Sequence, residues 1–542
     1  MVSAVHREWW RGAVTYQVYL PSFFDSDGDG VGDLRGLLGR LPHIASLGVD
    51  AVWISPFYRS PMHDFGYDVT DYRSVDPLFG TLADFDAVVA RAHDLGLKVI
   101  IDQVWSHTSS DHPWFGESRA ARANLKSDWY IWADPARDGA PPNNWLSVFG
   151  GSAWNWDARR RQYYLHQFLA SQPKLNLRNP AVLDAHFANA EFWLKRGVDG
   201  FRFDAVDFML HDEALGSNPA RPSSGGERPW DPFRMQRHVH DMVQPGTAAL
   251  MSRIRDFMNR FPGRVTIGEV SSEPGALDRV AMLTGATRLH MAYTLGVMKA
   301  AFTPATFRRA VADSTTLNSA GWLCWAFSNH DVERVTTRWN PAGRVPAAFA
   351  TLQMAMLLTL PGSVCLYQGE ELGLPNGRVA ADEMRDPYGL TFYPAISGRD
   401  GARTPMPWQA AAPNAGFSSC NRTWLPADPA HAEFAVDRQE ADATSTLAAY
   451  RCMIRYRHAH PALIVGETEL FDLPNPFVGW RRRLDGEAAI ALFNLSPEPA
   501  VVPPHAVPRF APADLPFVTA PSGDGIVLPP FGLTLGTERD NR

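Results

Sequence analysis

Short apolar runs recur along the chain at intervals typical of a protein that alternates strands with helices. Runs of this length, bounded by glycine or polar residues, predict buried strands. We expect eight strands, at residues 14–18, 51–54, 99–101, 201–203, 265–267, 291–293, 325–327 and 364–367. Amphipathic patterns at 34–47, 85–95 and 181–196 predict helices between them. This alternation predicts an α/β fold, a (β/α)8 TIM barrel.

Two parts of the chain depart from the alternation. Segment 108–176, after the third strand, is rich in Trp, Asn and Pro and predicts an inserted subdomain. From residue 460 onward, short alternating runs with Pro and Gly turns predict a C-terminal antiparallel β domain, a β-sandwich at 460–542. The catalytic barrel would then comprise 1–107 and 177–459. Long irregular segments at 212–231 and 375–429 also follow strands, so we expect them to wall a pocket.

Three acidic residues, Asp204, Glu269 and Asp331, each come just after one of the apolar runs. The carboxyl ends of barrel strands are where such folds build their active sites. Glycoside hydrolysis needs one carboxylate to attack and another to donate a proton. Arg202 precedes Asp204 by two residues, so both side chains share one face of a strand, and we expect the guanidinium to keep Asp204 ionised. The alternative is a purely structural Arg–Asp pair.

A candidate metal loop follows the first strand. Oxygen-bearing groups stand at alternating positions in Asp25-Ser-Asp-Gly-Asp-Gly-Val-Gly-Asp33, a spacing that hard cations favour. The predicted ligands are Asp25, Asp27, Asp29, the backbone carbonyl of Val31, and Asp33. The predicted cation is a structural Ca²⁺, with Mg²⁺ as the alternative. Gly36 stands where an EF-hand has its glutamate, and a solvated acidic turn is the other interpretation. No organic cofactor is expected.

Composition limits the possible partners. The 542 residues carry a net charge of −7 and no basic run, which argues against nucleic acid as a partner. The chain contains no stretch near the roughly 20 apolar residues of a membrane span, and its first ten residues lack the apolar core of a secretory signal. The four cysteines are far apart, and we expect buried free thiols at Cys324 and Cys365. These features predict a cytoplasmic protein; they do not predict its oligomeric state.

Five motifs, in order, resemble those of the α-amylase superfamily of glycoside hydrolases (family 13), in particular its α-glucosidase and oligo-1,6-glucosidase branch. They are Asp102-Gln-Val-Trp-Ser-His107, Gln172-Pro-Lys-Leu-Asn176, Gly200-Phe-Arg-Phe-Asp-Ala-Val206, Gly268-Glu-Val270 and Asn329-His-Asp331. The resemblance extends over nearly the whole chain. It implies a retaining enzyme that acts on a small oligosaccharide or α-glucoside.

The resemblance also implies residue roles. Asp204 matches the nucleophile, Glu269 the general acid/base, and Asp331 the carboxylate that holds sugar hydroxyls. The residues matched to sugar binding are Asp64, Tyr67, His107, Arg202, His330 and Arg399. Arg403 is an alternative to Arg399. Asp68 and Asp102 match structural positions.

Several activities stay open within this resemblance. Ala205 follows the nucleophile where valine accompanies α-1,6 cleavage in this branch, which favours exo-cleavage of terminal α-1,4-linked glucose from maltose-like sugars. The alternatives are an oligo-1,6-glucosidase, a glucosyltransferase that passes the sugar to an acceptor hydroxyl, and an isomerase of the same branch. A non-catalytic barrel is a further alternative, but such relatives usually lose carboxylates that this chain retains.

Overall fold

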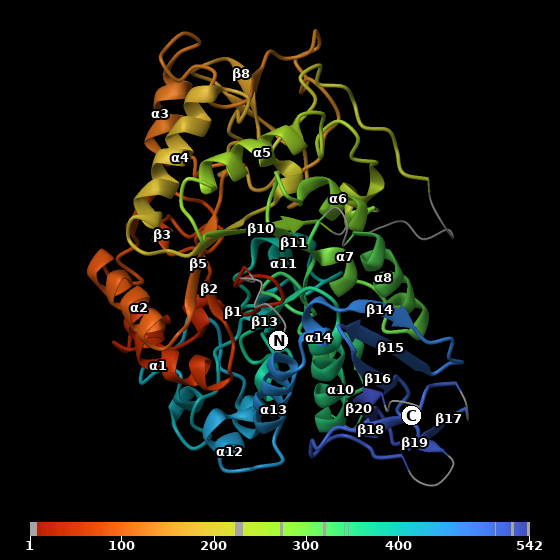
Figure 1. Ribbon diagram of the computed structural model, residues 1–542. Coiled ribbons are helices and arrows are strands. Elements are labelled where there is room, and N and C mark those ends of the chain that lie inside the picture. Colours follow the sequence, from red (N-terminus) through yellow and green to blue (C-terminus); the bar gives the residue numbers. More distant parts are fainter. Residues whose placement is uncertain are drawn as a thin grey trace.

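The computed structural model describes residues 8–222, 231–271, 275–317, 321–340, 342–344, 346–503, 506–521 and 525–538. At its centre lies a parallel eight-stranded sheet that curves into a barrel (Figure 1). Its strands are β1 (Val14–Val18), β2 (Ala51–Ile54), β5 (Lys98–Gln103), β9 (Gly200–Phe203), β10 (Val265–Val270), β11 (Met291–Thr294), β12 (Cys324–Trp325) and β13 (Ser363–Tyr367).

The strands pair with their neighbours in chain order, and β1 pairs with β13. A parallel bridge between Ala292 and Leu323 joins β11 to the segment before β12, so the barrel is nearly closed. Helices on the outside follow the strands: α1 (Leu34–Ser46), α2 (Leu82–Asp94), α4 (Pro180–Leu194), α5 (Thr247–Met258), α6 (Ala276–Leu283), α8 (Pro304–Leu317), α10 (Pro346–Thr359) and α13 (Thr446–Ala459). The predicted TIM-barrel fold is confirmed.

Alternation along each strand separates two hydrophobic layers. In β2, Val52 and Ile54 pack in the large cluster between strands and helices, whereas Trp53 belongs to the cluster inside the barrel. In β10, Val265 and Ile267 also belong to the inner cluster. Because successive side chains point to opposite faces, Glu269 continues the inward series of this strand. The apolar pattern of β10 therefore places a carboxylate on the inner face at the end of the strand.

The two predicted additions to the barrel are present. A small sheet, β6 (Trp132–Ala133), β8 (Gln162–Leu165) and β7 (Trp154–Asp157), comes after β5 and lies at the top of Figure 1 with α3 (Pro113–Ala120). The C-terminal sheet has the order β14 (Glu467–Leu470), β15 (Phe477–Leu484), β16 (Glu487–Asn494), β20 (Leu533–Glu538) and β18 (Phe510–Pro512), and β17 (Ala500–Val502) pairs with β19 (Ile526–Leu528). The domain boundaries at residues 107, 176 and 460 stay predictions.

Some elements differ from the expectation. β5 continues through Asp102 and Gln103, because both residues pair with β9 despite their polarity. β12 ends at Trp325 and not at Phe327, because only two of its residues pair with β13. A hairpin of β3 (Tyr58–Arg59) and β4 (Asp71–Val75) was not predicted. Residues 223–230 of the expected long loop lie outside the described residues.

Two smaller expectations concern thiols and membranes. Cys324 and Cys365 are buried free cysteines, as predicted. Among the described residues, the helices are all too short or too polar to cross a membrane.

Candidate active site

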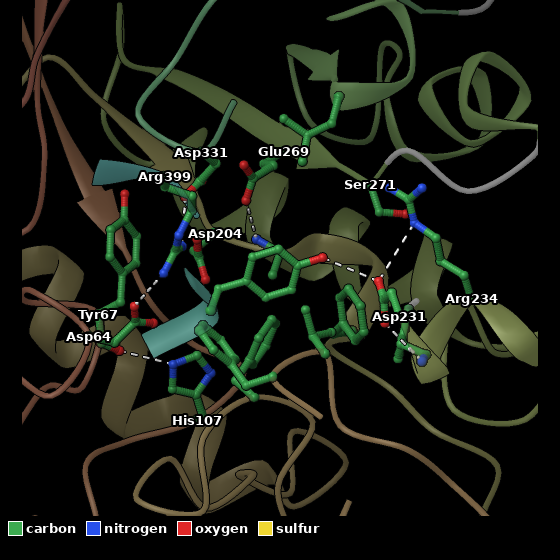
Figure 2. Close-up of a pocket in the computed structure, with 18 of the residues that line it drawn as sticks. Asp64, Tyr67, His107, Asp204, Asp231, Arg234, Glu269, Ser271, Asp331 and Arg399 are labelled. Atoms are coloured by element: carbon green, nitrogen blue, oxygen red, sulfur yellow. Dashed lines mark hydrogen bonds and ion pairs between the residues drawn. The ribbon is translucent and has the colours of Figure 1, made fainter. Parts of the chain in front are cut away.

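The three predicted carboxylates come together in one pocket at the carboxyl end of the barrel. Asp204 directly follows β9, Glu269 lies near the end of β10, and Asp331 lies six residues beyond β12. The same pocket is lined by the predicted sugar-binding residues Asp64, Tyr67, His107 and Arg399 (Figure 2). Two further predicted residues, Arg202 and His330, are fully buried and lie behind the lining side chains.

The buried guanidinium of Arg202 contacts Asp204, Glu269 and also Asp102. The guanidinium lies 2.8 Å from Asp204, 2.7 Å from Asp102 and 2.6 Å from Glu269. The expectation that Arg202 and Asp204 share one face is confirmed by this contact. However, one cation serves three carboxylates, so it cannot neutralise Asp204 alone.

The ionisation of Asp204 therefore differs from the simple expectation. Burial raises the pKa of Asp204 well above its usual range; Arg202 opposes this, whereas Glu269 and Asp102 raise it further. Burial also raises the pKa of Asp102 to about 6, again against the effect of Arg202. The expectation that Arg202 keeps Asp204 ionised is thus too simple, because the guanidinium is shared and the group of acids retains protons more tightly than ordinary carboxyls.

Glu269 is held by groups from three neighbouring elements. Its Oε1 accepts a hydrogen bond from the hydroxyl of Tyr293 on β11 at 3.1 Å, in addition to the contact with Arg202. Its Oε2 accepts from the backbone N–H of Ala205 at 3.1 Å. Ala205 has a left-handed backbone with φ of 43° and begins the short 3-10 turn after β9. This turn therefore fixes Glu269 beside Asp204.

The other end of the pocket is closed by a charged network. Arg399 lies 2.8 Å from Asp331, 3.1 Å from Asp64 and 2.7 Å from the buried Asp386. Arg403 is buried behind them, 3.0 Å from Asp331. Burial opposes ionisation of Asp331, but the guanidinium groups of Arg399 and Arg403 hold its pKa below the usual range. Of the two candidate arginines, Arg399 lines the pocket and Arg403 supports Asp331.

Both predicted histidines are neutral members of this network. Nδ1 of His330 lies 2.8 Å from the amide nitrogen of Gln17, and its Nε2 lies 2.7 Å from the hydroxyl of Tyr67. Nε2 of His107 lies 2.9 Å from the carbonyl oxygen of Tyr67. Burial lowers the pKa of His107 to about 4 and that of His330 to about 3. Both rings therefore position Tyr67 without adding charge.

Comparisons with known proteins agree with this geometry. Residues 17–466 match the family described as alpha amylase, catalytic domain. The chain belongs to the α-amylase family.

Three relatives of this α-amylase family member indicate which kinds of enzyme within the family are similar to it. A protein named probable alpha-glucosidase from Rhizobium meliloti is 48% identical over 91% of this chain and 90% of its own. The crystal structure of an alpha-glucosyl transfer enzyme, XgtA, superposes with a TM-score of 0.94 at 48% identity, over 98% of this chain and 100% of its own. A MutB mutant in complex with the substrate sucrose superposes with a TM-score of 0.87 at 30% identity, over 98% of this chain and 99% of its own. Other relatives are named oligo-1,6-glucosidase or maltase. The protein is a glycoside hydrolase of the α-glucosidase type.

Most residues in the outer wall of the pocket were not predicted from the sequence, although Asp231 and Tyr388 lie in the segments 212–231 and 375–429 that were expected to wall it. That wall consists of aromatic side chains and a polar group of residues. The aromatic residues are Phe149, Phe168, Phe208, Phe233 and Tyr388, and the polar ones are Asp231, Arg234, Ser271 and Lys299. Most of them lie in irregular segments without periodicity. The signal available was the excess of aromatic residues in the long segments that follow strands.

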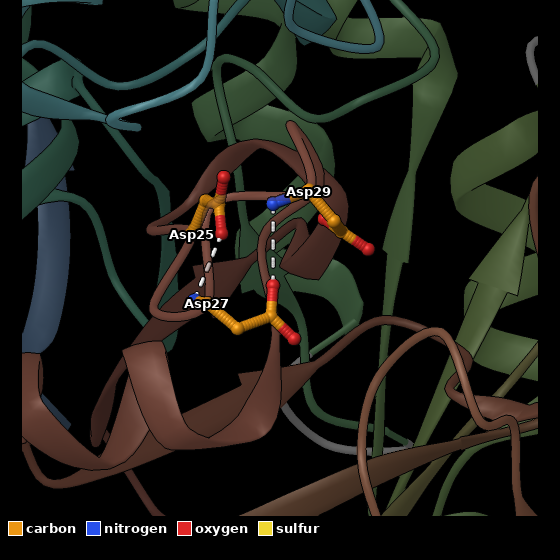
Figure 3. A group of neighbouring side chains, drawn as sticks. All are labelled: Asp25, Asp27 and Asp29. Atoms are coloured by element: carbon orange, nitrogen blue, oxygen red, sulfur yellow. Dashed lines mark hydrogen bonds between the residues drawn. The ribbon is translucent and has the colours of Figure 1, made fainter.

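The predicted metal loop brings three of its acids together. Carboxylate oxygens of Asp25, Asp27 and Asp29 lie within 4.8 Å of one another (Figure 3). Gly28 and Gly30 between them have φ of 82° and 96°, which lets the loop turn back on itself. Asp33 lies outside this group: its oxygens accept hydrogen bonds from Gly36 N and from Ser26, so it caps α1. The three acids are suitable ligands for a hard cation, and their mutual repulsion favours the binding of such a cation.

Proposed function

We propose that the protein is a retaining exo-acting α-glucosidase that removes terminal α-1,4-linked glucose from maltose-like oligosaccharides or α-glucosides. The observation that carries the proposal is a pocket with three carboxylates in its middle and the Arg399–Asp64 ion pair across its closed end. A closed end leaves room for the last sugar of a chain and blocks an internal one. Buried charged groups there are suited to binding the hydroxyls of a terminal glucose.

In the proposed reaction, a carboxylate oxygen of Asp204 attacks the anomeric carbon, and Glu269 donates its proton to the departing glycosidic oxygen. A covalent glucosyl-enzyme forms and the aglycone leaves. Glu269 then takes a proton from water, which attacks the same carbon and releases Asp204. Retaining enzymes hold the two carboxyls about 5 Å apart. The contact of one Arg202 guanidinium with both acids, at 2.8 and 2.6 Å, supports such a spacing.

The remaining charged residues have binding roles in this proposal. Asp331, held ionised by Arg399 and Arg403, would accept hydrogen bonds from sugar hydroxyls and stabilise positive charge at the anomeric carbon. Asp64 would hold the far hydroxyl, and Tyr67 would stack on the sugar face. Arg202 and His330 are positioning residues, since both are buried away from the space for the sugar.

A second activity, transfer of glucose to an acceptor hydroxyl, is favoured by the similarity to the alpha-glucosyl transfer enzyme. Both activities use the same covalent intermediate and differ in whether water or an alcohol attacks it. The aromatic outer wall would bind an acceptor and exclude part of the water. The ratio of new glucosides to free glucose at increasing acceptor concentration distinguishes the two activities.

We also propose that the loop of Asp25, Asp27 and Asp29 holds a structural Ca²⁺, with the carbonyl of Val31 as a further ligand. The loop joins β1 to α1 and lies apart from the residues that line the pocket. The ion would offset two of the three negative charges in a tight turn and has no role in the bond-breaking steps.

The test of the mechanism is to trap the intermediate. The enzyme is incubated with 5-fluoro-α-D-glucosyl fluoride, digested, and analysed by mass spectrometry. We expect one added fluoroglucosyl group on the peptide that contains Asp204, no label on Asp204→Asn, and a loss of activity by several orders of magnitude in that variant. Labelling of a peptide with Glu269 or Asp331 instead would contradict the assignment.

A further inference from the structure

A lysine stands at the outer part of the pocket, on the side of the general acid/base. Lys299 directly follows α7 (Leu295–Met298), which continues β11. β11 pairs with β10, the strand of Glu269. Lys299 lines the pocket together with Leu295, and its side chain is exposed. Within the part of the chain that the structure describes, the side chain of Lys299 makes no hydrogen bond or ion pair.

The acids that face Lys299 already have partners. Its charged neighbours are Asp231, Arg234, Glu269 and Asp331. Asp231 accepts hydrogen bonds from the backbone of Phe233 at 2.9 Å and from the hydroxyl of Tyr388 at 3.2 Å, and it lies 3.6 Å from Arg234 (Figure 2).

Glu269 is held by Arg202, and Asp331 by Arg399 and Arg403. Each acid in range thus already contacts a guanidinium, although Arg202 is shared with Asp102 and Asp204, whereas the ammonium of Lys299 is in no ion pair among the described residues.

The surroundings of Lys299 are partly apolar, although its side chain reaches solvent. The aromatic residues Phe208 and Phe233 line the same pocket. Burial by the pocket wall lowers the pKa of Lys299, and the nearby Arg234 lowers it further, while the acids oppose the shift. An ammonium in such a place gains more from a bound anion than a lysine on an open surface does.

We propose that Lys299 makes the aglycone subsite select leaving groups and acceptors that carry a carboxylate or a phosphate beside the reacting oxygen. The inference rests on the proposed glucosidase activity and specifies its second substrate. In transfer, the acceptor hydroxyl attacks the anomeric carbon, its proton passes to Glu269, and the bond to Asp204 breaks. The anion of the acceptor stays on Lys299 throughout and undergoes no reaction.

The experiment compares two α-glucosides of nearly equal shape. The aglycone is 3-carboxyphenyl in one and 3-carbamoylphenyl in the other, and kcat/KM is measured for both. The measured quantity is the ratio of the two values, in which differences in folding or in the amount of active enzyme cancel. We expect Lys299→Met to lower the carboxylate-to-carboxamide ratio about ten-fold, the size of one charge-assisted contact, and Lys299→Arg to retain most of it. For the unaltered enzyme, the ratio should fall as NaCl rises from low to high concentration.

A second part of the experiment tests whether Lys299 prefers a carboxylate or a phosphate. Transfer of glucose from maltose to glycerol 3-phosphate and to glycerol is compared in the same three proteins. A larger effect of Lys299→Met in this part than in the first identifies phosphate as the preferred group; the reverse identifies carboxylate. Ratios unchanged within two-fold in both parts, and insensitive to salt, would overturn the inference while leaving the glucosidase intact. If neither glucoside is cleaved at all, the proposed function itself fails.

Discussion

At the scale of single residues, the charge of Arg202 is divided among Asp102, Asp204 and Glu269. These four buried groups lie in contact around one guanidinium, so the ionisation of Asp204 depends on its neighbours. Asp204 must be ionised to attack. Because its pKa is raised, the ionised form is present at high pH and is lost as pH falls. In the pH profile of kcat/KM, the fall on the acidic side should therefore have an apparent pKa above the ordinary range of an aspartate.

Asp102→Asn tests this division of charge. The change removes an acid that raises the pKa of Asp204 and frees part of the Arg202 guanidinium. We expect the acidic limb of the kcat/KM profile on maltose to move to lower pH. Asp199→Asn is the matched control, since Asp199 is also buried but precedes β9 and pairs with Arg264. A limb that stays in place in Asp102→Asn, or that moves equally in the control, would contradict the account.

The prediction that the enzyme prefers α-1,4 to α-1,6 bonds depends on Ala205, and the backbone conformation of this residue also affects stability. The left-handed conformation of Ala205 costs any residue with a Cβ roughly 1–2 kcal/mol, and a β-branched side chain adds to that strain. We expect Ala205→Val to lower the free energy of unfolding further and to raise the kcat/KM ratio of isomaltose to maltose. Ala205→Gly is the control: it relieves the strain and should leave the ratio low. If valine leaves the ratio unchanged, Ala205 does not set the preference for α-1,4 bonds.

At the scale of elements, the strands could be predicted because a buried strand is a short apolar run with definite ends. All eight barrel strands overlap their predicted positions, and the carboxylates at three of their ends follow from that. The β3–β4 hairpin was missed because its residues, such as Arg59, Asp71 and Arg73, are largely polar. The surroundings of Lys299 and the contacts of Arg202 with Asp102 and Glu269 could not be predicted either, since both depend on which residues distant segments bring together.

The metal loop is an element whose contribution is measurable by itself. With Ca²⁺ bound, two of the three negative charges between β1 and α1 would be offset; without it the three acids repel one another more strongly. We expect EDTA to lower the melting temperature, Ca²⁺ to restore it, and Asp27→Asn to abolish the difference. Asp138→Asn, an exposed acid in another turn, is the control and should keep the response. Equal melting temperatures of the unaltered protein in EDTA and in Ca²⁺ would contradict a structural ion.

At the scale of the whole molecule, hydrogen bonds from two arginines attach the C-terminal sheet to the barrel. Arg482 on β15 donates to the carbonyls of Thr359, Leu463 and Gly466, and Arg308 on α8 donates to those of Leu473 and Phe477. Trp480 is fully buried beside Phe493. These contacts support a structural role for the sheet.

The buried histidines make the stability of the whole protein depend on pH. Burial lowers the pKa of several described histidines: His107, His112, His166, His186, His211, His290, His330 and His431. Below about pH 6.5 the unfolded chain binds protons that the folded chain does not, and each such histidine reduces stability by about 1.4 kcal/mol per pH unit. Acids with a raised pKa, such as Glu370 at about 8, offset part of this.

We therefore expect the free energy of unfolding, measured with urea, to fall as the pH is lowered from 7 to 5. His330→Gln should reduce the slope of that fall. A stability that is constant or increases towards pH 5 would show that the raised acids dominate.

The central claim is a double displacement through Asp204, and the anomer first released tests it most directly. Purified enzyme is mixed with 4-nitrophenyl α-D-glucopyranoside, whose leaving group is not a sugar, in an NMR tube, and the glucose released is followed before mutarotation. The account predicts that α-glucose appears first and β-glucose only later, at the rate of mutarotation. Initial release of β-glucose would contradict the covalent intermediate and the role given to Asp204.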